Sequence, residues 1–270
     1  MTAAAEEQTK RSVARFYDAL QDRYLSELDR NDRAGRAARA ILSGTVQLVA
    51  RLYAESHKSF VNLPVALDGG CGNGRWSAAY VNVGFTVLGL DLSCGMLRSA
   101  IRRLTAQSSM DRFHAVRADL SHLPLRPGSV DLVHLYGVVE HLPAADLRFT
   151  IRESSRVLRP EGLAVIDVPQ RGSMSHLLIA AASKFRLSQV PLFRFYSEHE
   201  TQRLIREARS KRLRLLHKQA TGYWYALFPF GRVLSRLPAR LLERLSRLVF
   251  RKPLGLLLVL SKLSDSGDRR

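Results

Sequence analysis

The chain has 270 residues, of which 46% are hydrophobic and 24% are charged, and this composition fits one globular unit with a full core. Two cysteines are too few for a disulfide framework and predict a reducing compartment. The first ten residues lack the basic start and apolar core of a secretory signal, and no run approaches the roughly 18 apolar residues that a membrane span needs.

The first sixty residues predict two amphipathic helices. Apolar residues recur at helical spacing from Val13 to Leu28 and again from Ile41 to Tyr53, with the polar stretch 31–36 between them. Such stripes serve equally well to pack on a sheet edge and to cap a ligand, and both uses stay open. We therefore predict a helical cap over 1–60 and a main domain over 61–270.

The chain is organised around residues 65–76, V-A-L-D-G-G-C-G-N-G-R-W. A short apolar run ends on Asp68 and breaks at once into a glycine turn. The pattern predicts a buried parallel strand, a tight turn and a helix that begins near Arg75. Glycines let a ligand approach the backbone closely, and a helix N-terminus points amide groups at it. The stretch therefore predicts a nucleotide-type cofactor site. Its glycines are Gly69, Gly70, Gly72 and Gly74.

The glycine spacing argues against a dinucleotide. The dinucleotide fingerprint has glycine at its first, third and sixth positions, but Arg75 occupies the sixth position here. D-G-G-C-G-N-G instead closely resembles the first motif of the class I S-adenosylmethionine-dependent methyltransferases. The resemblance implies that Asp68 faces the methionine moiety of the cofactor, directly or indirectly, and that the glycines let the cofactor lie across the turn.

Two further predicted strands also end on acids. T-V-L-G-L-D ends on Asp91, 23 residues after Asp68, which is the interval that a helix and a return loop occupy in a βαβ unit. F-H-A-V-R-A-D, predicted as the third strand, ends on Asp119. The resemblance implies that Asp91, with Leu92 beside it, binds the ribose diol, and that Asp119, with Leu120, meets the adenine.

The fourth predicted strand, 130–135, leads into Y-G-V-V-E-H-L-P, which begins at Tyr136. In open α/β sheets the reactive crevice lies at the carboxyl ends of the strands where the strand order reverses, and we expect the fourth strand to adjoin the first there. We therefore assign Tyr136 to the cofactor site. His141 titrates near neutrality and is the candidate general base for an acceptor hydroxyl or phenol; shaping the pocket is its alternative role.

The rest of the chain resembles the family in outline. We expect a fifth strand within 157–169, a sixth near 212–218 and a seventh over 255–262. The predicted fold is α/β, a Rossmann-like seven-stranded, mostly parallel sheet with helices on both faces. Helical insertions are expected at about 171–196 and 226–252, of which the second is basic, amphipathic and placed before the last strand.

The net charge of +18 is unevenly placed. Fourteen of the 42 Lys and Arg residues lie in 203–252, against Glu207 and Glu243 alone. Within 228–252, arginines and leucines each recur every three or four residues. This pattern suits a helix on an anionic membrane surface and, equally, a helix packed on the sheet. Nucleic acid is the other anionic partner that the charge allows.

The resemblance implies a methyltransferase that uses S-adenosyl-L-methionine and no metal. A small-molecule or lipid-like acceptor is favoured, because the loop after the fourth strand lacks the Asn/Asp-Pro-Pro-aromatic motif of amino-directed nucleic acid enzymes. RNA methylation through the basic C-terminal surface and a non-catalytic, cofactor-binding regulatory role are the alternatives. We expect a cytoplasmic protein, peripheral at the inner face of a membrane if 228–252 binds lipid.

Overall fold

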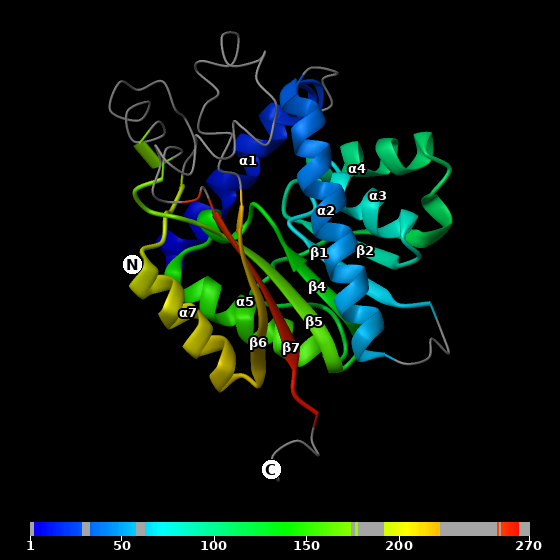
Figure 1. Ribbon diagram of the computed structural model, residues 1–270. Coiled ribbons are helices and arrows are strands. Elements are labelled where there is room, and N and C mark those ends of the chain that lie inside the picture. Colours follow the sequence, from blue (N-terminus) through cyan, green and yellow to red (C-terminus); the bar gives the residue numbers. More distant parts are fainter. Residues whose placement is uncertain are drawn as a thin grey trace.

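A seven-stranded sheet forms the centre of the computed structural model, in the order β3-β2-β1-β4-β5-β7-β6 (Figure 1). The described residues are 3–28, 33–57, 63–173, 176–177, 192–221, 253 and 255–264. The first five strands are parallel, and β7 pairs antiparallel with both β5 and β6. The predicted mostly parallel, Rossmann-like sheet is therefore confirmed. The strands are β1 (Val65–Gly69), β2 (Thr86–Asp91), β3 (Phe113–Arg117), β4 (Val130–Leu135), β5 (Leu158–Pro169), β6 (Leu213–Thr221) and β7 (Gly255–Lys262).

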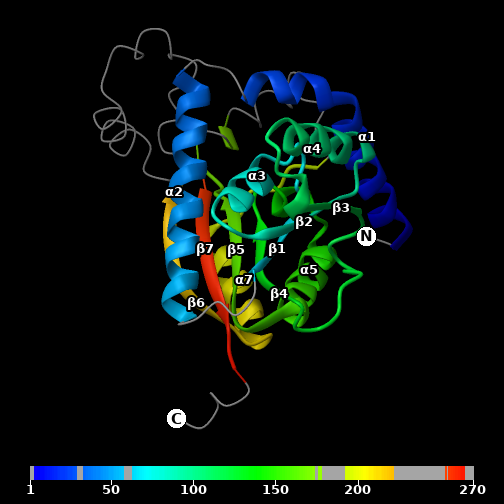
Figure 2. The same cartoon turned by 90° about the vertical axis from the view of Figure 1, so that its right-hand side faces the viewer.

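Helices cover both faces of the sheet, as predicted, and Figure 2 shows them on its two sides. One face packs against α2, α3 and α4, through buried side chains such as Val49, Tyr80 and Leu104. The opposite face packs against α5 and α7, through Ile151 and Leu204. All six residues of β4 are buried, including Asp131 and His134, because helices cover both faces of the sheet at this strand. The helices are α1 (Ala3–Leu28), α2 (Arg33–Ser56), α3 (Arg75–Asn82), α4 (Cys94–Ala106), α5 (Ala144–Val157) and α7 (Glu198–Ser210), with short 3-10 turns η1 (Met110–Arg112) and η2 (Val139–His141).

Two strand boundaries differ from the prediction. The third strand ends at Arg117 instead of Asp119, because β3 is an edge strand and its only partner, β2, ends at Asp91 opposite Arg117. Asp119 therefore lies in the loop that follows. The sixth strand continues to Thr221, because β7 offers partners as far as Gly255.

The first helix also begins earlier than predicted. The helix expected from Val13 begins at Ala3, where the sequence A-A-A-E-E-Q consists of strong helix formers. The expected insertion at 226–252 lies outside the described residues, as does most of that at 171–196. Among the described helices, none is long and apolar enough to cross a bilayer.

Candidate active site

A pocket lies at the carboxyl ends of the central strands, next to α1. The strand order reverses at β1, which lies between β2 and β4, and this is where ligands bind in open α/β sheets. The glycine turn, the ends of β2, β3 and β4, and one face of α1 contribute the walls. The predicted residues in the lining are Gly70, Gly72, Asp91, Leu92, Asp119, Leu120, Tyr136 and His141.

The glycine turn is built on backbone that only glycine adopts easily. Gly70 and Gly72 have φ values of 70° and 53°, in the left-handed region. The amides of Gly70 and Cys71 donate to the carbonyl of Leu90 at 2.7 and 3.0 Å, which ties the turn to the end of β2. A Cβ atom at Gly70 would overlap the side chain of Val138. The turn therefore brings bare backbone to the pocket wall.

Asp91 ends β2 with a carboxylate held by two backbone amides. Gly72 N donates to Oδ2 and Ser93 N to Oδ1, both at 2.9 Å. A carboxylate oxygen accepts two hydrogen bonds, so each oxygen keeps one position for a ligand. Burial raises the pKa of Asp91 to about 6, although backbone hydrogen bonds, those from Ser93 and Gly72 foremost, oppose the shift. The group is therefore ionised near neutral pH and can accept two further hydrogen bonds.

Asp119 is held by a cation from α1. Its Oδ2 lies 2.6 Å from Lys10 Nζ, while Ser121 donates to Oδ1 through its amide and its hydroxyl, both at 2.8 Å. Lys10 Nζ also lies 3.1 Å from Asp146 Oδ1. Burial alone would raise the pKa of Asp119, but the hydrogen bonds from Lys10 and Ser121 outweigh it and lower the pKa. Asp119 therefore stays ionised.

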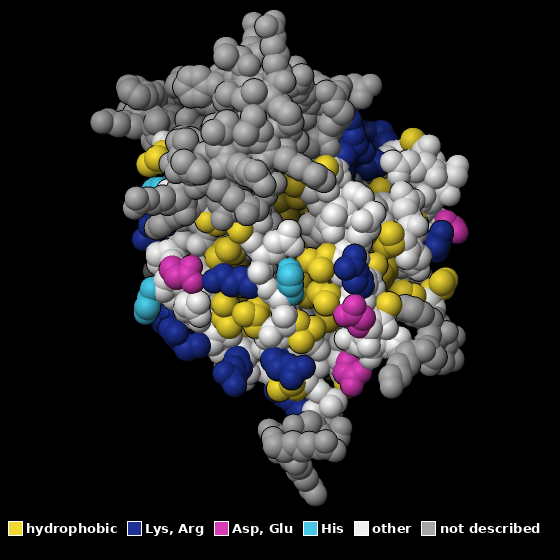
Figure 3. Space-filling view, in the orientation of Figure 1, with side chains coloured by type: hydrophobic (Ala, Val, Ile, Leu, Met, Phe, Trp, Pro, Cys, Tyr) yellow, Lys and Arg dark blue, Asp and Glu magenta, His cyan; other side chains and the backbone are white. Residues whose placement is uncertain are grey.

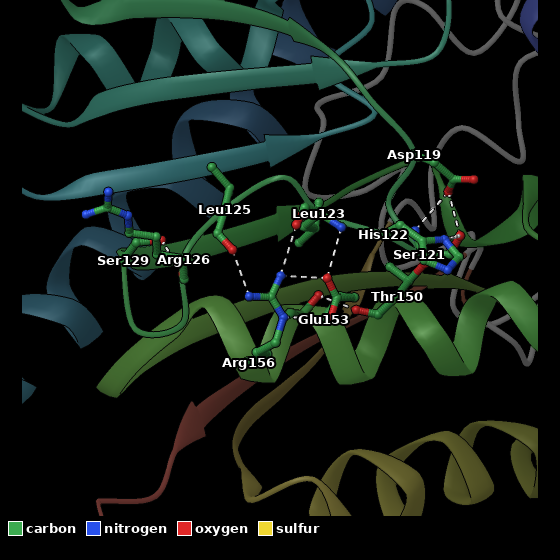
Figure 4. A network of polar contacts seen from close by, with 11 residues as sticks. Asp119, Ser121, His122, Leu123, Leu125, Arg126, Ser129, Thr150, Glu153 and Arg156 are labelled. Carbon is green, nitrogen blue, oxygen red and sulfur yellow. Dashed lines mark hydrogen bonds and ion pairs between the residues drawn. The ribbon is translucent and has the colours of Figure 1, made fainter.

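The loop that begins with Asp119 is fixed to α5 by a polar network (Figure 4). Arg156 donates to the carbonyls of Leu125 and Leu123, at 2.7 and 3.0 Å. Glu153 accepts the amide of Leu123 at 2.9 Å and pairs with Arg156 at 2.7 Å. Because this arginine satisfies carbonyls that no strand partner reaches, the loop keeps one path across the sheet edge. The position of Asp119 therefore depends on α5 as well as on β3.

His141 has both ring nitrogens engaged. Nδ1 lies 2.8 Å from the carbonyl oxygen of Leu192, which only accepts, so Nδ1 carries the hydrogen. In the neutral ring Nε2 is then the acceptor, and Tyr17 Oη donates to it at 2.8 Å. Burial lowers the pKa of His141, and the Leu192 carbonyl only partly opposes this. His141 is therefore uncharged near neutral pH, with its basic nitrogen directed at Tyr17.

Three predicted residues lie behind the lining. Asp68 is buried and accepts from Ser77 Oγ at 2.6 Å, with His134 Nδ1 at 3.4 Å. A Cβ atom at Gly69 would lie 2.7 Å from Leu120 and Leu135, and one at Gly74 would lie 2.9 Å from Ala100 of α4. These glycines allow close packing beneath the turn. A direct contact between the cofactor and Asp68, Gly69 or Gly74 stays a prediction.

Sequence reasoning kept a cap over the ligand open as one role of α1, but it did not single out the residues that α1 contributes. Lys10, Val13, Ala14 and Tyr17 line the pocket, and they share one face of α1 at helical spacing. Asp18 accepts from Ser93 Oγ at 2.6 Å and from Gly95 N at 2.7 Å. The apolar stripe already contained Val13 and Tyr17, and polar residues beside that stripe were the signal available.

Two more lining features concern the turn itself. Asn73 lines the pocket, and its Nδ2 is buried without a hydrogen-bond partner among the described residues. Burial raises the pKa of the Cys71 thiol, so this cysteine is a neutral part of the wall. Within the described part of the chain, no cluster of three His, Cys, Asp or Glu side chains could hold a metal ion.

The fold and the pocket define a class. The protein family described as "Methyltransferase domain" matches residues 67–166, which contain the glycine turn, Asp91, Asp119 and the loop after β4. The domain built on these residues belongs to the class I S-adenosylmethionine-dependent methyltransferases, as the first motif indicated. The cofactor of the family is S-adenosyl-L-methionine.

Individual relatives agree on this class and differ in acceptor. The chain is 35% identical over 143 residues to malonyl-[acyl-carrier protein] O-methyltransferase of Methylovorus sp. (strain MP688), covering 50% of this chain and 46% of that protein. It is 29% identical over 147 residues to ubiquinone biosynthesis O-methyltransferase of Thiobacillus denitrificans, covering 53% and 62%. The chain thus spans about half the length of the curated relatives it matches.

Solved structures extend the likeness to most of the chain. Geranyl diphosphate C-methyltransferase from Streptomyces coelicolor A3(2), solved with Mg²⁺, geranyl diphosphate and S-adenosyl-L-homocysteine, aligns with a TM-score of 0.63. The alignment covers 94% of this chain and 98% of that one at 16% identity. At this identity the likeness concerns the fold alone.

Proposed function

We propose that the protein transfers the methyl group of S-adenosyl-L-methionine to a small-molecule or lipid-like acceptor. The observation that carries the proposal is the pocket at the strand-order reversal, where left-handed glycines, an amide-held Asp91 and the loop after β4 meet. Its residues fit the cofactor. Asp91 has two acceptor positions for a diol, and Asn73 Nδ2 is a buried donor that a bound polar group would satisfy.

The proposed binding residues divide by part of the cofactor. Asp91 takes the ribose hydroxyls, beside Leu92, while ionised Asp119 accepts from the adenine amino group, beside Leu120. Gly70 and Gly72 let the methionine moiety lie across the turn. The bound cofactor supplies an electrophilic sulfonium methyl. The chain contributes orientation and exclusion of water, with Tyr136 facing the methyl group, and these account for most of the catalysis expected in such a displacement.

The acceptor side of the proposal is supported by the charge of the C-terminal half. Exposed cations gather along the α7–β6 edge (Figure 3), and 228–252, outside the described residues, continues the basic character. An amphiphilic acceptor or membrane with an anionic head group suits such a surface. A relative named for an acyl-carrier protein substrate is compatible with this class. The exposed cations are Arg203, Arg206, Arg209, Arg212, Arg214 and Lys218.

Binding and metabolite experiments test the function. Calorimetry of the purified protein should detect S-adenosyl-L-homocysteine binding, and preference for a dinucleotide would overturn the cofactor assignment. Metabolite extracts of cells with the protein, without it, and with Asp91→Ala in its place should differ by compounds one methylene heavier. The same compounds in the Asp91→Ala cells would mean that this protein does not make them. RNA that gains the methyl group in place of small molecules would favour the RNA alternative.

The membrane surface is tested separately by vesicle co-sedimentation. Replacing Arg240, Arg244 and Arg247 with Gln should weaken binding to anionic vesicles, and salt should weaken it further. The matched control replaces three exposed arginines outside the α7–β6 edge, Arg98, Arg102 and Arg126, with Gln and so removes the same charge. If the wild-type protein binds neither anionic nor neutral vesicles, the membrane proposal is wrong and packing on the sheet is the remaining interpretation of 228–252. If the control variant loses as much vesicle binding, the binding depends on the net charge of the protein and not on 228–252.

A further inference from the structure

Tyr17 reaches from α1 to the only basic atom of His141. The hydroxyl lies 2.8 Å from Nε2, and the Leu192 carbonyl, 2.8 Å from Nδ1, fixes which nitrogen carries the hydrogen. Tyr17 and His141 both line the pocket. Any proton that reaches this imidazole from the pocket therefore arrives at the nitrogen to which Tyr17 is already hydrogen-bonded.

The imidazole is also fixed in orientation. Its ring meets Tyr17 edge-on, at 5.4 Å between centroids, and meets Phe193 edge-on at 5.3 Å. The His141 amide donates to the carbonyl of Val138 at 2.9 Å, which holds the backbone of η2. Rings held on two sides keep the Oη–Nε2 direction constant, as a proton relay requires.

We propose that Tyr17 is a catalytic residue that passes the acceptor's proton to His141. The proposal rests on the methyltransferase function above. A tyrosine hydroxyl that donates one hydrogen bond still accepts others, so an acceptor O–H or N–H can donate to Tyr17 Oη while Tyr17 donates to Nε2. The pair therefore selects acceptors that present a hydrogen-bond donor at the reacting atom, such as a phenol, an acidic hydroxyl or an amine.

The transfer balances in charge and protons. The bond from the acceptor oxygen or nitrogen to the methyl carbon forms as the sulfur–methyl bond breaks, and the sulfonium becomes a neutral thioether. The acceptor proton moves to Tyr17 Oη, and the original hydroxyl proton of Tyr17 moves to Nε2. The positive charge that leaves sulfur thus appears on His141 as imidazolium, which afterwards releases its proton to solvent.

Other contacts hold α1 in place without the hydroxyl of Tyr17. Lys10 pairs with Asp119 at 2.6 Å and Asp146 at 3.1 Å, two turns before Tyr17. Asp18, the next residue, accepts from Ser93 and Gly95. Removing one hydroxyl should therefore leave α1 docked, and a proton-transfer role can be separated from a structural one.

The test compares Tyr17→Phe, His141→Gln, the double variant and Arg11→Gln, a control in an exposed i,i+4 pair of the same helix. The acceptor source is a small-molecule extract of cells that lack the protein, supplied with S-adenosylmethionine labelled in the methyl group. Tyr17→Phe and His141→Gln should each transfer label roughly 100-fold more slowly, and Arg11→Gln should transfer it at the wild-type rate. The double variant should be within about threefold of the singles, because the residues act as a unit. All four proteins should bind S-adenosyl-L-homocysteine within about threefold of wild type.

Three outcomes would overturn the relay. A Tyr17→Phe rate within about threefold of wild type would remove the catalytic role. A parallel loss of cofactor affinity would make Tyr17 a docking residue. Nitrogen NMR that finds the hydrogen of His141 on Nε2 would contradict the direction of transfer. Failure of the wild-type protein itself to transfer label would instead overturn the proposed function, and the relay with it.

Discussion

Replacing Asp91 with Ala tests the cofactor site most directly. The carboxylate oxygens each accept one backbone amide at 2.9 Å and keep one position for a ligand hydroxyl. A hydrogen bond to a charged group contributes about 1.5 to 3 kcal/mol. In the Asp91→Ala variant, water replaces part of the lost interaction. We therefore expect the loss of both hydrogen bonds to the ligand to reduce the binding free energy by about 1.5 to 3 kcal/mol in total. Binding of S-adenosyl-L-homocysteine should therefore weaken roughly 10- to 150-fold.

Calorimetry measures this loss against two matched variants. Asp91→Asn keeps one acceptor oxygen and should fall between wild type and Asp91→Ala. Asp111→Ala removes an acid whose side chain is 75% exposed in η1 and should bind as wild type does. Urea unfolding of each variant checks that the Gly72 and Ser93 amides, left without Asp91, have not unfolded the turn. Unchanged affinity in a folded Asp91→Ala protein would refute the ribose assignment.

Further predictions concern pH, the glycine turn and a helix cap. Wild-type affinity for S-adenosyl-L-homocysteine should fall as the pH drops through about 6, the pKa of Asp91, since the protonated acid loses acceptor strength; a flat calorimetric profile from pH 5 to 7.5 would contradict this. Glu140 is buried, Oε2 has no partner among the described residues, and burial with Asp167 raises its pKa to about 8. Its protonated form is therefore favoured on folding, and stability should decline between the ordinary pKa of 4.5 and about 8. In urea unfolding, Glu140→Gln should show a smaller fall of stability over this pH range than wild type does. Parallel stability–pH profiles of the two proteins would contradict the assignment to Glu140. Gly70→Ala should lower the free energy of unfolding by roughly 1 to 3 kcal/mol and weaken cofactor binding. Gly84 also has a positive φ, but the space at its Cβ position is open, so Gly84→Ala should lose stability only through the strained backbone conformation and should bind the cofactor as wild type does. Ser197→Ala breaks the capping box of α7 and should cost about 1 kcal/mol in urea unfolding with no change in cofactor affinity; a weaker cofactor complex would mean that α7 affects the pocket.

The sheet and the acids at its edge were predictable because their signals are local. β2, β4 and β7 have the expected bounds and β1 extends one residue past Asp68, since each is a mainly apolar segment closed by an acid, a glycine or a loop. Three of the expected cofactor residues lie behind the wall, because spacing along a turn does not say which backbone faces a ligand. Asp68 illustrates this, since its carboxylate accepts a hydrogen bond from Ser77 and contacts His134.

The sequence left two roles open for α1, and it could not show which residues of this helix meet the pocket. Its partners are 75 to 136 residues away, and the contacts are single polar pairs that leave no periodic trace. An amphipathic stripe shows that a helix packs on something without saying on what. The pairing of Tyr17 with His141 needed the relative placement of α1, η2 and the segment around Leu192.

The long separation between α1 and its partners has a consequence during synthesis. Tyr17 leaves the ribosome before His141 has been made, and Lys10 likewise precedes Asp119 by 109 residues. Among the α1 side chains that the structure describes, from Ala5 to Ala19, none is buried, so none of them belongs to the core of the sheet. The wall of the pocket that α1 provides depends on polar contacts to Asp119, His141 and Asp146, which can form only after those residues have been made.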